Sequence, residues 1–160
     1  MSSEAPAQQW RIFQINASNG GVPKLAVRQG QVSMLGLEGD RQRDSENHGG
    51  PERALCLFSL ERILALQAEG HPIFPGSVGE NLTLSDLDWD QVKPGARLNL
   101  GKQVVVEVTR YTEPCRNIRA SFVGENFSRI AQHRYPGWSR VYARVLAEGE
   151  IVVGDVVSFG

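Results

Sequence analysis

The sequence predicts a mostly β, single-domain fold, a β barrel with two or three short helices. Many short apolar stretches follow one another at close spacing, and turns rich in glycine, proline or asparagine separate them, a pattern typical of barrels. The strand–helix alternation of a doubly wound parallel sheet is missing. The 160 residues suit one domain, and no linker or low-complexity segment divides them. We expect a loose N-terminal segment at 1–9 and one domain at 10–160.

The first quarter of the chain predicts three short strands followed by a loop. Residues 10–17 alternate between two faces, as a strand does. The Asn-Gly-Gly signal at 19–21 predicts a turn, after which 22–27 is expected to return as a second strand. The apolar piece at 32–37 is the third. Because residues 40–47 are charged or polar and include no aliphatic side chain, we expect a solvated loop there.

The rest of the chain predicts one clear helix among further strands. A buried strand at 54–58 leads to Ser59, a good helix N-cap, and the apolar spacing from Leu60 predicts a helix that Gly70 and Pro72 end. A second helix, or a pair of short ones, is expected at about 117–132. The remaining predicted strands are 82–84, 96–100, 103–110, 141–146 and 152–159.

Composition excludes several classes of protein. The formal net charge is −1 and the pI about 6.3, which argues against a dedicated nucleic-acid binder. The two cysteines lie far apart without a C-x-x-C pair, so neither a disulfide framework nor a zinc-finger spacing is present. No segment resembles a signal peptide or is long enough to span a bilayer. We therefore expect a cytoplasmic protein that contacts no membrane.

The polar, glycine-rich loop 45–51 is the first candidate site. It contains His48 and leads directly into the apolar run at 54–58. Gly49 and Gly50 allow a close backbone approach to a bound group, and a polar loop held by a rigid strand is a common place for a site. The same residue types also make plain surface turns, so the residues alone leave both interpretations open.

Cys115 is the second candidate. Pro114 suits the start of a helix, which places Cys115 near the first turn, where backbone N–H groups favour a thiolate. The thiolate would also be favoured by three arginines near it in the sequence, Arg110, Arg116 and Arg119. Cys56 lies between two leucines in a predicted strand, so we expect it to be a small buried apolar residue.

The chemistry of Cys115 is open at this point. A thiolate attacks electrophiles and also binds soft metals. A Cys–His hydrolase, with Cys115 as nucleophile and His48 as base, is possible, although the sequence shows no third, orienting residue. A structural zinc site needs more ligands than two isolated cysteines supply.

Three stretches, taken together, resemble the MOSC domain family, named after the C-terminal domain of molybdenum cofactor sulfurase. They are His-Gly-Gly-Pro at 48–51, Pro-Gly-Ser-Val-Gly-Glu-Asn-Leu-Thr at 75–83 and Glu-Pro-Cys at 113–115, and they occur in the order of the family. The end of the chain, at 137–138 and 152–155, is similar to small stand-alone bacterial members. The resemblance extends from about residue 21 to 159 and implies a compact β barrel.

The resemblance also implies a function. It suggests binding of the molybdenum cofactor (molybdopterin, a pyranopterin), with Cys115 ligating the molybdenum, and an oxidoreductase that reduces N-hydroxylated small molecules. Since the chain shows no ferredoxin-like or flavin domain, a separate electron-transfer or sulfur-donor protein is expected. His48 would donate to phosphate or supply a proton. The other expected contacts are phosphate contacts from Gly49, Gly50, Arg53 and Arg116, and contacts to the pterin ring from Glu80 and Asn81.

Two other functions remain open from the sequence. In the first, the protein carries sulfur as a persulfide on Cys115 and turns over no small substrate. In the second, it is a non-catalytic domain that binds some other anionic ligand. Both use the same cationic surroundings of Cys115, so sequence alone does not separate them from a reductase.

Overall fold

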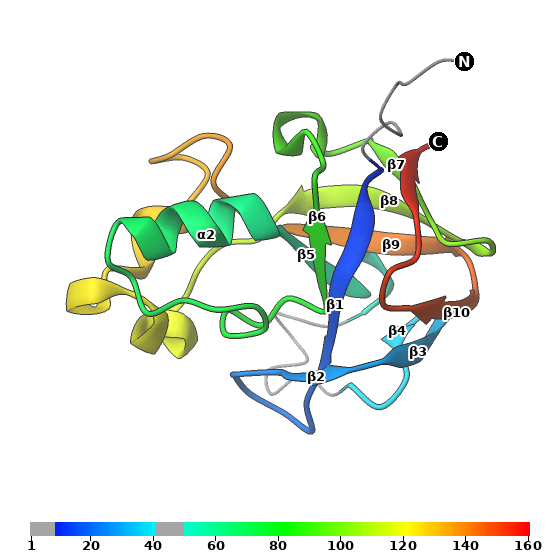
Figure 1. Ribbon diagram of the computed structural model, residues 1–160, viewed down its shortest axis with the longest axis horizontal. Helices are drawn as coiled ribbons and strands as arrows, with labels where there is room; N and C mark the ends of the chain where they lie inside the picture. The colour runs from blue at the N-terminus through cyan, green and yellow to red at the C-terminus, as the bar shows by residue number, and fades with distance from the viewer. Residues whose placement is uncertain (1–8, 41–49) are drawn as a thin grey trace, which may run out of the picture.

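The computed structural model describes residues 9–40 and 50–160. Most of these residues belong to two β-sheets (Figure 1). The larger sheet has eight strands in the order β11-β7-β8-β9-β5-β6-β1-β2, and neighbours are antiparallel except for the parallel pair β5 and β6. Its strands are β1 (Arg11–Ala17), β2 (Leu25–Val27), β5 (Leu55–Ser59), β6 (Leu82–Ser85), β7 (Arg97–Leu100), β8 (Val104–Tyr111), β9 (Val141–Ala147) and β11 (Val157–Phe159).

A three-stranded sheet accompanies it, in the order β10-β3-β4. Its strands are β10 (Gly149–Val152), β3 (Gln29–Ser33) and β4 (Gly36–Leu37). The single strand predicted at 32–37 is therefore a hairpin, because the chain reverses at Met34 and Leu35 and Val32 pairs with Leu37. The predicted final strand, 152–159, is also divided, with β10 ending at Val152 and β11 beginning at Val157.

The mostly β class is confirmed, but the barrel is not. The larger sheet runs from β11 at one end to β2 at the other without a ladder that joins its ends. The first part of β1 approaches the C-terminal segment at an isolated bridge between Arg11 and Val156. Farther along, β1 pairs with β2 instead, through Ile15 and Val27. One strand thus divides its free edge between two partners, and the described strands form open sheets.

The predicted helix after Ser59 is present as α2 (Leu60–Ala68). The Ser59 hydroxyl accepts a hydrogen bond from the Arg62 backbone N–H at 3.2 Å, as an N-cap does. Gly70 follows the helix with φ 102°, a conformation in which glycine is favoured. In Figure 1 α2 lies on the same side of the sheets as the yellow segment around residue 120, away from β3, β4 and β10.

The helix predicted at 117–132 is a chain of short 3-10 helices. They are η3 (Arg116–Ser121), η4 (Val123–Glu125) and η5 (Phe127–Ile130). Phe122 is extended, and Gly124 inside η4 has φ 64°, so the α-helical hydrogen-bond ladder cannot continue through either residue. Two more 3-10 helices, η1 (Pro51–Arg53) and η2 (Trp89–Gln91), complete the elements of the described residues.

The core lies between the sheets and these helices. Every residue of β5 is buried, because β6 and β9 flank it in the sheet and other elements cover its faces. α2 contributes Ile63 and Leu66 to the same apolar cluster. Each such side chain contributes roughly 1.5–3 kcal/mol through burial. In the described part of the chain, no helix has the length and apolar character needed to cross a membrane.

Candidate functional site

Cys115 is the N-cap residue of η3, so it lies next to the first turn as predicted, although Pro114 precedes the helix and does not start it. Its backbone is extended, with φ −135° and ψ 171°, and its carbonyl accepts the Ile118 N–H at 3.2 Å. The side chain is half-buried and makes no capping hydrogen bond. Arg116 and Arg119, on the first turns of η3, are exposed. Cys115 is thus partly accessible to a ligand, and the arginines that follow it in η3 are exposed.

Tyr142 connects this cysteine to the segment after the glycine loop. The Arg53 guanidinium lies 5.8 Å from the centre of the Tyr142 ring, a cation–π contact. Burial raises the pKa of the Tyr142 phenol; Cys56 and Cys115 add to that rise, whereas Arg140 and Arg53 oppose it. The phenol therefore keeps its proton at neutral pH. We call Arg53, Cys115 and Tyr142 the Cys115 wall.

Cys56 occupies the opposite environment from Cys115. It is buried in β5, directly across from Tyr142 of β9, and its sulfur lies 3.8 Å from the Thr112 hydroxyl. Burial raises the pKa of its thiol, more strongly than Arg140 lowers it. Cys56 is thus a buried neutral thiol, as the sequence predicts.

Glu80 and Arg140 are both buried, and Arg140 is near enough to lower the pKa of Glu80. Glu80 is fully buried, and one of its carboxyl oxygens accepts the Thr83 hydroxyl at 3.1 Å. Its other oxygen and the Nε of Arg140 have no hydrogen-bond partner among the described residues, although Arg140 donates to the Val78 carbonyl at 2.6 Å. Burial raises the Glu80 pKa to about 7, against the lowering effect of backbone hydrogen bonds, Thr83 and Arg140.

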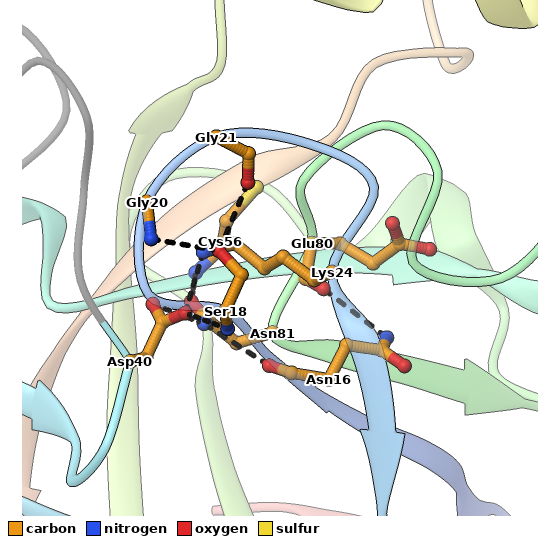
Figure 2. A network of polar contacts seen from close by, with 9 residues as sticks. All are labelled: Asn16, Ser18, Gly20, Gly21, Lys24, Asp40, Cys56, Glu80 and Asn81. Carbon is orange, nitrogen blue, oxygen red and sulfur yellow. Dashed lines mark hydrogen bonds and ion pairs between the residues drawn. The ribbon is translucent and has the colours of Figure 1, made fainter.

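A second polar cluster surrounds Asp40 (Figure 2). Lys24 and Asp40 form a salt bridge of 2.6 Å, and their side chains are only 3% and 5% exposed. The Ser18 N–H donates to the same carboxylate oxygen at 3.0 Å, and the Asn81 amide donates to the other at 2.9 Å. The Asn81 side-chain oxygen accepts the Cys56 N–H at 2.9 Å. With Asn16, which donates to the Glu80 carbonyl at 3.1 Å, these residues are the Asp40 network.

The Asp40 network and η1 lie on either side of residues 41–49, which contain most of the glycine-rich loop. Asp40 is the last described residue before that loop. On the other side, the Thr109 hydroxyl donates to the Glu52 carbonyl at 2.6 Å, which ties η1 to β8. Gly50 caps η1 with φ 91°, a conformation that glycine adopts easily. His48 and Gly49 lie outside the described residues.

The structure brings some of the predicted site residues together and separates others from them. Arg53 lies over the Tyr142 ring, and Cys115 is near enough to Tyr142 to contribute to the raised pKa of its phenol. Arg116 directly follows Cys115 in the chain, and both Arg116 and Gly50 are exposed. Glu80 and Asn81 are fully buried, and the described hydrogen bonds of Asn81 are all internal. Their predicted contacts with a pterin ring stay predictions.

Sequence reasoning missed Tyr142 and Arg140. Tyr142 lies in β9 and Arg140 directly precedes it, and the alternating pattern of this segment is that of an ordinary strand. The position of Tyr142 depends on its pairing with Cys56 of β5, which no local pattern predicts. Lys24 was also missed, and Asp40, which was expected to begin a solvated loop, has a side chain only 5% exposed. An isolated lysine and aspartate carry no signal of mutual burial, because the contact depends on the path of β2. The described residues contain no cluster of His, Cys, Asp and Glu that would hold a metal by itself.

Comparison with known proteins identifies relatives over most of the chain. The MOSC domain model matches residues 44–158. The chain is 34% identical to the uncharacterized protein YflK of Bacillus subtilis (strain 168), over 74% of this chain and 52% of the relative. It is 30% identical to YiiM of Escherichia coli (strain K12), over 75% and 54%. A protein named reductase in Gibberella moniliformis is 30% identical over 79% of this chain and 23% of its own length. The chain thus spans about half the length of YflK and YiiM.

Solved structures share the fold. YiiM from Geobacillus stearothermophilus aligns with a TM-score of 0.74 and 25% identity, covering 94% of this chain and 75% of that chain. The YuaD protein from Bacillus subtilis aligns with a TM-score of 0.69 over 94% of both chains. At 16% identity, the second similarity concerns the fold alone.

Proposed function

The chain belongs to the MOSC domain family, and from that premise we propose that it binds the molybdenum cofactor with Cys115 as a ligand of the metal. The family is associated with this cofactor. The observation that carries the proposal is the exposure of one of two cysteines: Cys115 is half-buried beside exposed arginines, whereas Cys56 is enclosed in the core. Soft metals prefer thiolate ligands, and only Cys115 is accessible to a group from solvent.

The surrounding residues fit the rest of the cofactor. A pterin phosphate needs cations and backbone N–H groups, and Arg53 and Arg116 lie on the segments that bring Gly50 and Cys115 to the site.

We further propose that the activity is the reduction of N-hydroxylated compounds. The balanced change is R₂N–OH + 2 e⁻ + 2 H⁺ → R₂NH + H₂O: the N–O bond breaks, an N–H bond forms, and the oxygen leaves as water. When bound, the cofactor supplies the redox centre. A separate electron-transfer protein would supply the electrons, as the resemblance to the family implies. The Gibberella protein named reductase supports this class of reaction.

Cofactor loading tests the proposal. The protein is purified from a host that makes molybdopterin, and bound molybdenum and extractable pterin are measured for the wild type, Cys115→Ser and Cys56→Ser. We expect near-stoichiometric cofactor in the wild type and in Cys56→Ser, and a loss in Cys115→Ser. Equal loading in Cys115→Ser and the wild type would contradict the assignment of the ligand. If no variant takes up pterin, a different anionic ligand is favoured.

The half-exposed sulfur also supports a second function, sulfur transfer. In this reaction the Cys115 thiolate attacks the outer sulfur of a donor protein's persulfide. The donor's S–S bond breaks, its cysteine leaves as a thiolate, and Cys115 becomes a persulfide. Intact mass after incubation with such a donor separates the two functions. A sulfur carrier gains one sulfur on Cys115, which a reductant removes, and it reduces no N-hydroxylated compound.

A further inference from the structure

A groove of about 320 Å³ lies where β1 passes from one partner to the other. Three segments form it: β1, the corner between β2 and β3, and the end of β10 with the residue after it. Its lining includes Phe13, Gln14, Val27, Arg28, Val152 and Val153. None of these residues belongs to the Cys115 wall or to the Asp40 network, so the groove is a separate feature of the molecule.

Backbone hydrogen bonds join the three segments in a ring. At one end β1 pairs with β2. The Val153 N–H donates to the Arg28 carbonyl at 2.9 Å, which ties the chain after β10 to the corner between β2 and β3. The Gly154 N–H donates to the Ile12 carbonyl at 2.8 Å and so returns the ring to β1. Because these bonds fix the segments before any ligand arrives, little binding free energy is spent on ordering them.

An irregularity in β1 exposes the Phe13 ring at this groove. Ile12 and Ile15 are both buried, at 1% and 0% exposed, although a regular strand places residues three apart on opposite faces. The register between β1 and β6 shifts between Ile12 and Gln14, which allows both isoleucines to reach the core and leaves Phe13 45% exposed. Such bulges often redirect a side chain beside a functional site. The strand itself therefore fixes the position of the exposed ring.

The groove combines apolar walls with one cation. Four apolar side chains of the lining are 38% to 45% exposed: Phe13, Val27, Val152 and Val153. The amide nitrogen of Gln14 already donates to two acceptors within the protein, at 2.7 and 3.1 Å. Arg28 is exposed, and its guanidinium has no ion pair or hydrogen bond with any other residue that the structure describes. Arg28 is thus the hydrogen-bond donor that this lining offers to a ligand.

We propose that this groove binds a small amphipathic carboxylate, with its hydrocarbon chain against the four apolar side chains and its carboxylate on Arg28. A guanidinium binds a carboxylate through two parallel hydrogen bonds. Since a cavity of about 150 Å³ holds benzene, the 320 Å³ of this groove has room for a chain of roughly eight carbons. Binding of this ligand requires neither the cofactor nor Cys115.

The charge of Arg28 decides between this ligand and other occupants of an apolar groove. A neutral apolar ligand would take water from the guanidinium and return no acceptor to it, which costs free energy. A second copy of the chain, related by a two-fold axis, would bring the same surface and therefore another Arg28 to the interface. An anion with an apolar chain matches both parts of the lining.

Calorimetric titration of the full chain at low salt tests the groove. Octanoate has both parts of the proposed ligand, octan-1-ol has the same chain without the charge, and butanoate has the charge on a shorter chain. The variants are Arg28→Gln and Phe13→Ala, with Phe74→Ala as a matched control. Phe74 is 48% exposed and lines a different groove, so Phe74→Ala removes a similarly exposed ring elsewhere on the protein.

We expect the wild type to bind octanoate more tightly than octan-1-ol or butanoate. Arg28→Gln should weaken octanoate binding by roughly three- to tenfold, because charge-assisted hydrogen bonds are lost, and should leave octan-1-ol unchanged. Phe13→Ala should weaken both eight-carbon ligands by roughly three- to tenfold, because less apolar surface is removed from water. Phe74→Ala and Cys115→Ser should bind octanoate as the wild type does.

A pair of substitutions at Val153 keeps the test decisive if Phe13→Ala does not fold. Val153→Glu places a carboxylate in the groove beside Arg28, and Val153→Gln has the same length without the charge. Octanoate should bind Val153→Glu more weakly than Val153→Gln, because the new carboxylate competes for Arg28 and repels the ligand.

Three results would overturn the proposal. The first is that the wild type does not bind octanoate at millimolar concentration. The second is that Arg28→Gln and Val153→Glu bind octanoate as tightly as the wild type, even if Phe13→Ala binds it more weakly, because recognition would then not involve the charge. The third comes from sedimentation: if Val153→Glu makes a self-associating wild type monomeric and octanoate does not bind, a second copy of the chain covers the groove.

Discussion

The Asp40 network and the Cys115 wall differ in how completely their charges are matched. Both oxygens of Asp40 accept hydrogen bonds, from Lys24 and Ser18 on one and from Asn81 on the other, and the Lys24 and Asp40 side chains are buried. The Cys115 wall combines a half-exposed thiol with Arg53, and exposed Arg116 follows directly in the chain. The charges of the Asp40 network are matched within it, whereas the exposed Arg116 follows the thiol at the Cys115 wall.

The difference shows which polar residues serve the fold and which are available for chemistry. A buried ion pair that satisfies all its partners positions backbone segments, and this one fixes the turn before β2 and the start of the glycine loop. Glu80 and Arg140 are only partly satisfied, because each has one buried polar atom without a hydrogen-bond partner among the described residues. Substitutions in the network should therefore change stability, and substitutions at the wall should change ligand binding.

The largest expected effect is the loss of the Lys24 charge. Lys24→Met keeps most of the side-chain volume but leaves Asp40 buried without its cation, which should lower the free energy of unfolding by about 3–5 kcal/mol. Arg97→Met is the control, because the Arg97 side chain in its pair with Glu107 is 58% exposed and should cost at most about 1 kcal/mol. Urea denaturation of both variants measures the difference. Similar decreases in the free energy of unfolding for Lys24→Met and Arg97→Met would mean that the buried pair contributes no more to stability than an exposed pair.

Glu80→Gln should have a smaller effect that depends on pH. The Glu80 pKa is raised to about 7 in the folded protein, so the carboxyl binds its proton more tightly in the folded than in the unfolded state. Wild-type stability should fall as pH rises from about 4.5 to 7. Glu80→Gln does not ionise and should be more stable than the wild type at pH 8, by on the order of 2–3 kcal/mol, with little difference at pH 4.

Glu107→Gln gives the opposite sign and serves as the control for Glu80. Hydrogen bonds from Arg97 and Arg144 lower the Glu107 pKa, so the stabilisation that its carboxylate provides is present at neutral pH and is lost on acidification. At pH 8 the free energy of unfolding should be lower for Glu107→Gln than for the wild type and higher for Glu80→Gln, as measured from unfolding curves across this pH range. If both variants follow the wild type in parallel, the assigned pKa shifts are wrong.

The smallest expected effect concerns Arg116, which directly follows Cys115 in the chain. Iodoacetate is an anion and iodoacetamide is neutral, so the ratio of their alkylation rates at Cys115 reports local positive charge. Arg116→Gln should lower that ratio about two- to threefold at low salt, and added salt should reduce the difference. Peptide mass spectrometry follows both cysteines. Cys56 should stay unmodified until the protein unfolds and serves as the internal control. An unchanged ratio of the two rates in Arg116→Gln would show that Arg116 does not supply positive charge at Cys115.

Local patterns in the sequence predicted those elements that depend on neighbouring residues. The valines of β8, the Ser59 cap and the position of Cys115 next to the first turn of η3 are all as expected. The division of 32–37 into two strands and the open sheets depend on long-range pairing that no local pattern contains. For the same reason the burial of Asn81 was not predicted: a polar residue after a glycine-rich loop looks like a ligand contact until Asp40 and Cys56 are brought to it.

The central claim, that Cys115 ligates molybdenum, is tested most directly at the metal. X-ray absorption at the molybdenum edge counts the sulfur neighbours of the metal in loaded wild type, Cys56→Ser and Cys115→Ser, the last reconstituted with excess cofactor. We predict one sulfur fewer in Cys115→Ser than in the other two proteins. The same sulfur count in all three, with cofactor bound, would contradict the account and place Cys115 outside the metal's coordination sphere.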